Sequence, residues 1–306
     1  MLVGSTEIRK VHEMDLNGMT LAQLMPAMDL HVPRAHPDWL PDGTVDRDGH
    51  AMLSLHCWLV RHDGHTILID TGAGNGKSRP QQEVLDHLEN PFLERLAQAG
   101  VGPEDVDYVL HTHIHSDHVG WNTHWLDDTW RPTFPNATTI CSALEWRYGA
   151  ALARGDEAGI AIARDEAGLG SPVRIPVSGT FEDSMEPLQT GGQLRLIPID
   201  GAEILPGVRF LSTPGHSIDH AAIEIRSDGK IALFGGDLMH HPLEIYDPEL
   251  VSSFCEFPDA ARRSRLAMLE HAADQDMIWF SAHFPCSSAG RISRRDGGYA
   301  WTFADA

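Results

Sequence analysis

Residues 109–120 read Val109-Leu110-His111-Thr112-His113-Ile114-His115-Ser116-Asp117-His118-Val119-Gly120 and contain four histidines and one aspartate. The apolar run before it, residues 106–110, ends in a cluster of histidines, as expected where a buried strand opens into a loop. His113 and His115 are two residues apart, so in an extended segment their rings point to the same side, and Asp117 and His118 follow after the chain turns. Imidazole and carboxylate groups together suit zinc.

Three further segments each place one metal-ligand side chain directly after an apolar run. The ligand-type residues are His216, Asp237 and His283. The runs before them cover residues 208–212, 231–234 and 277–280. Because each candidate follows a predicted strand, we expect these side chains to gather at strand ends and to supply the ligands that the histidine cluster alone lacks.

Together these residues resemble the metallo-β-lactamase superfamily, specifically its binuclear metallo-hydrolases of the lactonase and methyl parathion hydrolase branch, over about residues 52–285. The resemblance implies two Zn²⁺ ions per chain, with Mn, Co or Fe as alternatives. It implies one metal held by His113, His115 and His216, a second held by Asp117, His118 and His283, and Asp237 as the bridge. The segment Leu68-Ile69-Asp70-Thr71-Gly72 matches the family's strand and turn beneath the site, so we expect Asp70 to support the ligands. His111 is expected to support the site or to be exposed, but not to bind a metal, and His220 matches a family position that supports the site.

The order of predicted strands and helices indicates an α/β protein, and the pattern alone leaves a doubly wound sheet open. The resemblance implies an αββα sandwich of two mixed β-sheets flanked by helices. We predict a single domain over residues 1–306. Residues 1–50 form an N-terminal extension that would act as a flap over the site or as a dimer contact.

Local patterns predict the main elements. Residues 52–61 and 65–70 are β-rich runs joined by His62-Asp63-Gly64, and the Asp-Gly pair indicates a hairpin. The other predicted elements are an edge strand over 7–12, a helix over 91–99, helices over 143–167 with breaks near Gly155 and Gly159, a strand over 188–199, a helix over 258–273 and a last strand over 277–280. Residues 121–135 are predicted to be a loop whose tryptophans either line a substrate pocket or pack beneath it.

Composition limits the partners. The formal net charge is −21, from 44 acidic and 23 basic residues, which disfavours nucleic acid and anionic membrane surfaces. No signal-like apolar segment begins the chain, so we predict a cytoplasmic protein that acts on a small molecule, with a homodimer as one candidate assembly. The widely spaced Cys57, Cys141, Cys255 and Cys286 are predicted to be reduced, buried thiols.

The sequence departs from the resembling lactonases after the bridging aspartate. Those enzymes tend to carry a tyrosine three residues beyond it, and here that position is His240, which keeps a protonatable donor; the alternative is that His240 and His241 lie in a surface loop. True β-lactamases of the superfamily have Cys or Ser in place of Asp237. We therefore predict a binuclear zinc hydrolase in which a metal-bridging hydroxide attacks a small ester, lactone or phosphotriester, with Asp117, Asp237 and His240 as catalytic residues. The alternatives are an iron-dependent sulfur or redox enzyme on the same fold and a metal-binding protein without turnover.

Overall fold

The computed structural model describes residues 1–29, 31 and 36–305. The chain forms two compact units, each assembled from segments that are far apart in the sequence. Unit 1 contains Met1–Met14, Leu55–Gly170 and Ile175–Ile199, and unit 2 contains Asp15–Ser54, Ser171–Arg174 and Asp200–Ala306. The predicted extension over 1–50 is divided between the two units, and its residues 30 and 32–35 lie outside the described residues. The single domain and the flap stay predictions.

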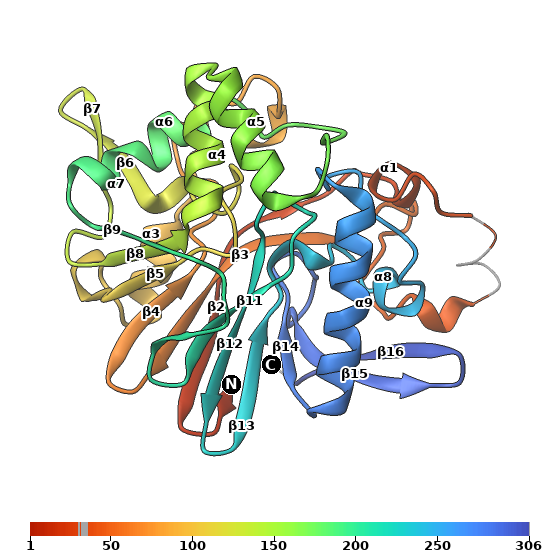
Figure 1. The fold of residues 1–306 in the computed structure, drawn as a ribbon. Helices are drawn as coiled ribbons and strands as arrows, with labels where there is room; N and C mark the ends of the chain where they lie inside the picture. Colours follow the sequence, from red (N-terminus) through yellow and green to blue (C-terminus); the bar gives the residue numbers. More distant parts are fainter. Residues whose placement is uncertain (30, 32–35, 306) are drawn as a thin grey trace. The chain divides into compact units, whose positions relative to one another are not determined.

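Unit 1 is built on a seven-stranded mixed sheet with the order β1-β2-β3-β4-β5-β8-β9 (Figure 1). Its strands are β1 (Leu2–Val3), β2 (Thr6–Leu16), β3 (Leu53–His62), β4 (His65–Ile69), β5 (Tyr108–Leu110), β8 (Thr138–Ser142) and β9 (Leu194–Ile197). β3 and β4 form the predicted antiparallel hairpin, whereas β4, β5, β8 and β9 pair in parallel. The carboxyl ends of these parallel strands therefore meet at one edge of the sheet, where the histidine-rich loop begins after Leu110.

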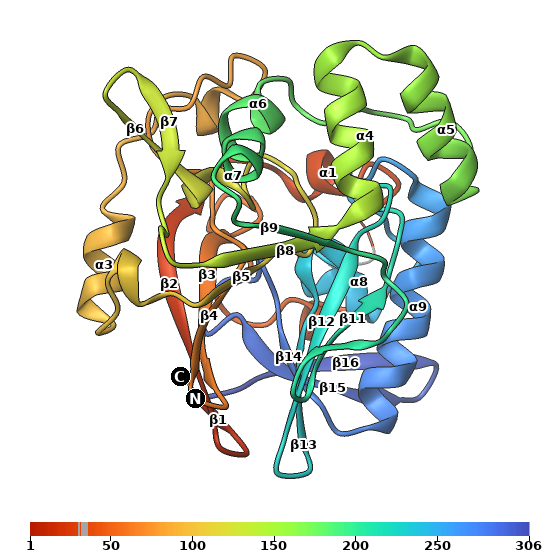
Figure 2. The same cartoon turned by 60° about the vertical axis from the view of Figure 1, so that its left-hand side comes forward.

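The helices of unit 1 are α3 (Phe92–Gln98), α4 (Ala143–Arg154), α5 (Glu157–Ala167), α6 (Thr180–Ser184), α7 (Glu186–Thr190) and the 3-10 helices η2 (Glu83–Leu85), η3 (Pro103–Asp105) and η4 (Gly120–Asn122). α4 and α5 lie side by side in both views (Figures 1 and 2). Gly155 ends α4 in the left-handed conformation, as predicted. The predicted break at Gly159 is wrong, because the Asp156 side chain caps α5 by accepting the N–H of Gly159. The strand predicted over 188–199 shrinks to β9 because Pro187, in the first turn of α7, starts a helix there.

Residues 123–132 form a β-hairpin where a loop was predicted. β6 (Thr123–Leu126) pairs antiparallel with β7 (Thr129–Pro132), and Figure 2 shows this hairpin apart from the seven-stranded sheet. Asp127 and Asp128 make the turn with φ angles of 51° and 58°, a conformation that aspartate tolerates better than most residues. A two-residue turn with both φ angles positive matches the twist of antiparallel strands, so the hairpin forms without an Asn-Gly or Asp-Gly signal.

The tryptophans of this region have two different environments. Trp121 is buried, stacks on Phe92 and donates its Nε1–H to Glu13 Oε1 at 2.8 Å, so it packs beneath the loop. Trp125 is 55% exposed and contacts Trp130 edge-on at 5.2 Å between ring centroids. Trp121 and Trp125 also line a cavity of about 510 Å³ within unit 1. A role for them in substrate binding stays a prediction.

Unit 2 is built on a second seven-stranded mixed sheet with the order β10-β11-β12-β13-β14-β15-β16. Its strands are β10 (Glu203–Leu205), β11 (Val208–Ser212), β12 (Ala221–Ser227), β13 (Lys230–Phe234), β14 (Ile278–Phe280), β15 (Ala289–Arg295) and β16 (Gly298–Phe303). β13 pairs in parallel with β14, and the neighbouring pairs run antiparallel. The prediction that the last strand ends at residue 280 is wrong, because β15 and β16 form a C-terminal hairpin around Asp296-Gly297. The arginines of β15 interrupt the apolar pattern of its sequence, although one face of the strand is buried.

Among its described residues, unit 2 contains the helices α1 (Leu21–Leu24), α8 (Leu243–Tyr246), α9 (Pro258–Asp274), η1 (Pro37–Trp39) and η5 (Gly236–Leu238). α9 matches its predicted range and packs against β15, where Leu269 and Met268 join Trp279 and Trp301 in the core of this unit. Across the residues that the structure describes, no helix is long and apolar enough to cross a membrane.

The cysteines follow the prediction at three of four positions. Cys57, Cys141 and Cys255 are buried, and burial raises the pKa of each of these thiols, which keeps them protonated. Cys286 is exposed, which corrects the prediction for that residue. It lies in the tight turn after β14, where its φ is 58°.

Candidate metal-binding site

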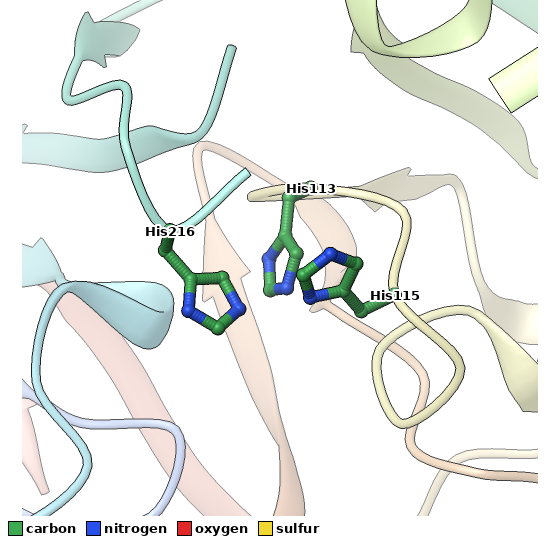
Figure 3. A group of neighbouring side chains, drawn as sticks. All are labelled: His113, His115 and His216. Carbon is green, nitrogen blue, oxygen red and sulfur yellow. The ribbon is translucent and has the colours of Figure 1, made fainter. Parts of the chain in front are cut away.

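The first set of candidate ligands lies on the loop that follows β5 in unit 1. The rings of His113 and His115 are 4.5 Å apart in an edge-on arrangement, and Figure 3 shows both side chains projecting from this loop. The ring of His118 is 4.1 Å from that of His113, and its Nε2 is 3.9 Å from Asp117 Oδ2. His113 and His118 are buried, whereas His115 and Asp117 are half-buried. Unit 1 thus brings its four predicted ligands together.

Asp70 anchors two of these histidines from beneath. Its Oδ2 accepts a hydrogen bond from His118 Nδ1 at 2.9 Å and another from Thr112 Oγ1 at 2.8 Å. Because the Thr112 hydroxyl donates to Asp70, its oxygen is left to accept from His113 Nδ1 at 3.0 Å. Both Nδ1 atoms are therefore engaged on the sheet side, which turns the two Nε2 atoms away from the sheet.

The environment keeps Asp70 ionised. Burial acts to raise the pKa of its carboxyl group, but the charge of His118 and hydrogen bonds from His118 and His111 outweigh burial, so the pKa lies well below its usual range. Asp70 has a φ of 55° and accepts the backbone N–H of Thr112 at 2.9 Å. His111 is buried, and its Nε2 is 3.0 Å from Asn122 Oδ1, so it supports the loop from below.

The second set of candidate ligands converges on Asp237 in unit 2. His216 Nε2 is 3.2 Å from Asp237 Oδ2, and His283 Nε2 is 3.0 Å from Asp237 Oδ1. Figure 3 shows His216 on the loop that follows β11. Asp237 lies in η5, directly after β13, with φ and ψ of −96° and 23°, a sparsely populated region common at functional sites. All three side chains are buried, so these contacts are shielded from water.

Residues outside the predicted set orient the ligands of unit 2. His216 Nδ1 is 3.8 Å from Cys255 Sγ, and His283 Nδ1 donates to the carbonyl of Ser54 at 3.2 Å. His220 acts as predicted: its Nε2 accepts the backbone N–H of Asp237 at 3.0 Å. The sequence offers no spacing signal for Cys255 or Ser54, because both reach the ligands only through tertiary structure.

His240 contacts the same carboxylate as His216. Its Nε2 is 3.2 Å from Asp237 Oδ2, and His216, Asp237 and His240 together present ligand atoms within 4.8 Å of one another. The ring of His240 stacks on that of His283 at 5.4 Å. The surface-loop alternative is wrong for both histidines, since His240 and His241 are buried.

His241 is held apart from this cluster. Its Nε2 is 2.9 Å from the carbonyl of Thr44, and burial lowers its pKa to about 4. It is therefore neutral at physiological pH and has a structural role.

The donor chemistry within each unit fits divalent metals that accept nitrogen and oxygen ligands. Each unit groups imidazole rings with a carboxylate, and the Nδ1 atoms of four histidines have partners behind them. Histidines that bind metals through Nε2 are held through Nδ1 in this way.

Comparison with known proteins identifies the family. The model of the metallo-β-lactamase superfamily matches residues 53–283, which is more than half of the chain. The chain belongs to the metallo-β-lactamase superfamily. Two curated proteins extend the comparison. A probable metallo-hydrolase of Mycobacterium tuberculosis is 26% identical over 292 residues, covering 87% of this chain and 86% of that protein. An N-acyl homoserine lactonase of Bacillus thuringiensis is 26% identical over 195 residues, covering 59% of this chain and 62% of that protein.

Solved structures show the metallo-β-lactamase fold over the whole chain. The dizinc quorum-quenching lactonase AidC superposes with a TM-score of 0.78 at 19% identity, covering 100% of this chain and 97% of that one. The hydrolase AbOPH superposes with a TM-score of 0.77 at 22% identity, with the same coverage. The predicted fold class, α/β with two mixed sheets flanked by helices, is confirmed.

Proposed function

We propose that this metallo-β-lactamase superfamily member is a binuclear zinc hydrolase that acts on a small ester, lactone or phosphotriester. The family, the lactonase and metallo-hydrolase relatives and the two sets of ligand-type residues support the proposal. The proposed ligands of the first metal are His113, His115 and His216, those of the second are Asp117, His118 and His283, and Asp237 is shared.

One observation carries the proposal. The Nδ1 atoms of His113, His118, His216 and His283 each have a partner within their own unit. This arrangement fits metal ligands, because a contact at Nδ1 fixes the ring and leaves the Nε2 lone pair free to point at an ion.

Divalent metals held by these residues would supply Lewis acidity and a nucleophile at neutral pH. The chain contributes the electrostatics and the proton transfers. Asp237 would carry the negative charge that two cations share, and Asp117 would contribute a second carboxylate. His240, whose Nε2 is 3.2 Å from Asp237 Oδ2, would donate a proton to the departing alkoxide or a hydrogen bond to a developing oxyanion.

Asp237→Ala tests the proposal. The variant should lose bound zinc and nearly all turnover, because water cannot replace a shared carboxylate while keeping two cations together. Wild-type protein should contain about two zinc ions per chain and hydrolyse members of a panel of lactones, aryl esters and organophosphates. One iron per chain with oxygen uptake would instead support the redox alternative, and tight metal binding without turnover would support a binding protein. Cytoplasmic location and a homodimer remain predictions of the sequence.

A further inference from the structure

A buried glutamate holds the backbone of both histidines that follow Asp237. Glu244, in α8, accepts the N–H of His240 at 2.6 Å and the N–H of His241 at 3.2 Å through the same oxygen, Oε2. That oxygen is also 4.0 Å from His240 Nδ1. Glu244 is completely buried, so these contacts are shielded from solvent and are strong.

Arg265 of α9 holds Glu244 from the other side. Its Nη2 is 2.6 Å from Glu244 Oε1, and both side chains are completely buried. The same guanidinium donates to the carbonyl of Leu238 at 3.1 Å, and to those of Pro248 and Leu250. The arginine thereby ties together the chain before His240, the helix after it and the loop beyond α8.

The buried pair of Glu244 and Arg265 is better explained by geometry than by stability. A buried ion pair is often no more stabilising than apolar side chains of the same volume, so stability alone gives little reason for it. Its effect is geometric, because several charged hydrogen bonds fix one conformation of the loop that carries His240. His240 is the residue that gains from this, since its Nε2 must stay 3.2 Å from Asp237.

We propose that Glu244, held by Arg265, is a positioning residue that sets the place of His240 against Asp237. The proposal rests on the proposed function, in which His240 donates a proton or hydrogen bond to the substrate. A misplacement of about 1 Å at such a donor costs up to about 100-fold in rate, which sets the size of the expected effect.

Two substitutions test it. Glu244→Gln removes the charge that pairs with Arg265, and Glu244→Asp keeps the charge but withdraws the carboxylate from the two N–H groups. Glu224→Gln is the matched control, because Glu224 is also a completely buried carboxylate of unit 2, paired with Arg209 at 2.8 Å and Arg226 at 2.6 Å. Each variant is made alone and combined with His240→Ala, and turnover is compared at equal metal content.

The expected result is strong coupling between Glu244 and His240. Glu244→Gln and Glu244→Asp should lower kcat by about 10- to 100-fold with little change in KM, and should change it by less than about threefold when His240 is already alanine. Amide hydrogen exchange at His240 and His241 should speed up in Glu244→Asp, a readout that does not depend on turnover. Glu224→Gln should lower the melting temperature and leave kcat within about twofold of wild type.

Equal losses of kcat in the presence and absence of His240 would overturn the proposal, as would unchanged kcat in Glu244→Asp. If Glu244→Gln does not fold, Glu244→Asp decides the question, because it keeps the partner of Arg265. Should His240→Ala alone turn over like wild type, the proposed role of His240 fails, and the positioning proposal fails with it. If His240→Ala is slow but the coupling is absent, only the positioning proposal fails.

Discussion

Replacement of Asp70 by asparagine should weaken metal binding although Asp70 is not a proposed ligand. The asparagine oxygen can still accept the N–H of Thr112, which Asp70 accepts at 2.9 Å. Its amide group then faces His118 Nδ1, where the carboxylate accepts a hydrogen bond at 2.9 Å. Two donors cannot face each other, so His118 must move its proton from Nδ1 to Nε2 or turn its ring. Either change removes the Nε2 lone pair from the proposed metal.

The size of the effect follows from the contacts. Asp70 orients His118 directly and His113 through the Thr112 hydroxyl, so one substitution disturbs one proposed ligand of each metal. Loss of a group that orients a metal ligand typically costs about 10- to 100-fold in metal affinity. That corresponds to about 1.4 to 2.7 kcal/mol of binding free energy. We expect a loss in this range for zinc.

The assay is competition for zinc between the metal-free protein and a chromophoric chelator of known affinity. Asp107→Asn is the matched control, because Asp107 also accepts a backbone N–H, that of Thr66 at 2.8 Å, but is largely exposed. Its zinc affinity should equal that of wild type. An affinity of Asp70→Asn within about twofold of wild type would show that the orientation of His118 by Asp70 does not matter for zinc binding.

Three further predictions follow from individual contacts. His240→Ala should lower turnover about 10- to 1000-fold at equal metal content, and His240→Tyr should restore lactone hydrolysis preferentially; full activity of His240→Ala would assign the proton to another group. Burial lowers the pKa of His241 to about 4, so the unfolded chain takes up a proton near pH 6.5 before the folded chain does. Stability should therefore fall as the pH drops from about 6.5 to 4, by up to about 3 kcal/mol, and urea unfolding of metal-free His241→Gln should lack this loss; equal pH profiles would contradict the assignment. Gly120→Ala should destabilise unit 1 by about 1 to 3 kcal/mol because the added Cβ meets the carbonyl of Ala73, whereas Gly298→Ala, which has open space, should change little; equal unfolding midpoints would contradict this.

The sequence was most informative for candidate ligands that lie just after the end of a strand. His113, His216, Asp237 and His283 each follow a strand that the apolar runs predicted, since a buried strand must end where polar side chains begin. The β6–β7 hairpin was not predicted because its turn is Asp127-Asp128, which is a weaker turn signal than the Asn-Gly or Asp-Gly pair.

The groups behind the ligands were harder to predict. Asp70 could be foreseen because it stands at the end of β4 in a segment that resembles the family. Cys255 and Ser54 could not, since their contacts with His216 and His283 arise only when distant segments pack together. Glu244 lies four residues after His240 in the sequence, but its contact with the His240 backbone depends on where α8 places the Glu244 side chain.

The central claim is that the two sets of side chains hold two metals that share Asp237. The most direct measurement is a crystal structure of the zinc-loaded protein, with anomalous diffraction recorded on both sides of the zinc absorption edge. We expect two zinc peaks per chain, one bound by His113, His115 and His216, the other by Asp117, His118 and His283, with Asp237 bound to both. A single peak, or two peaks of which one does not contact Asp237, would contradict it.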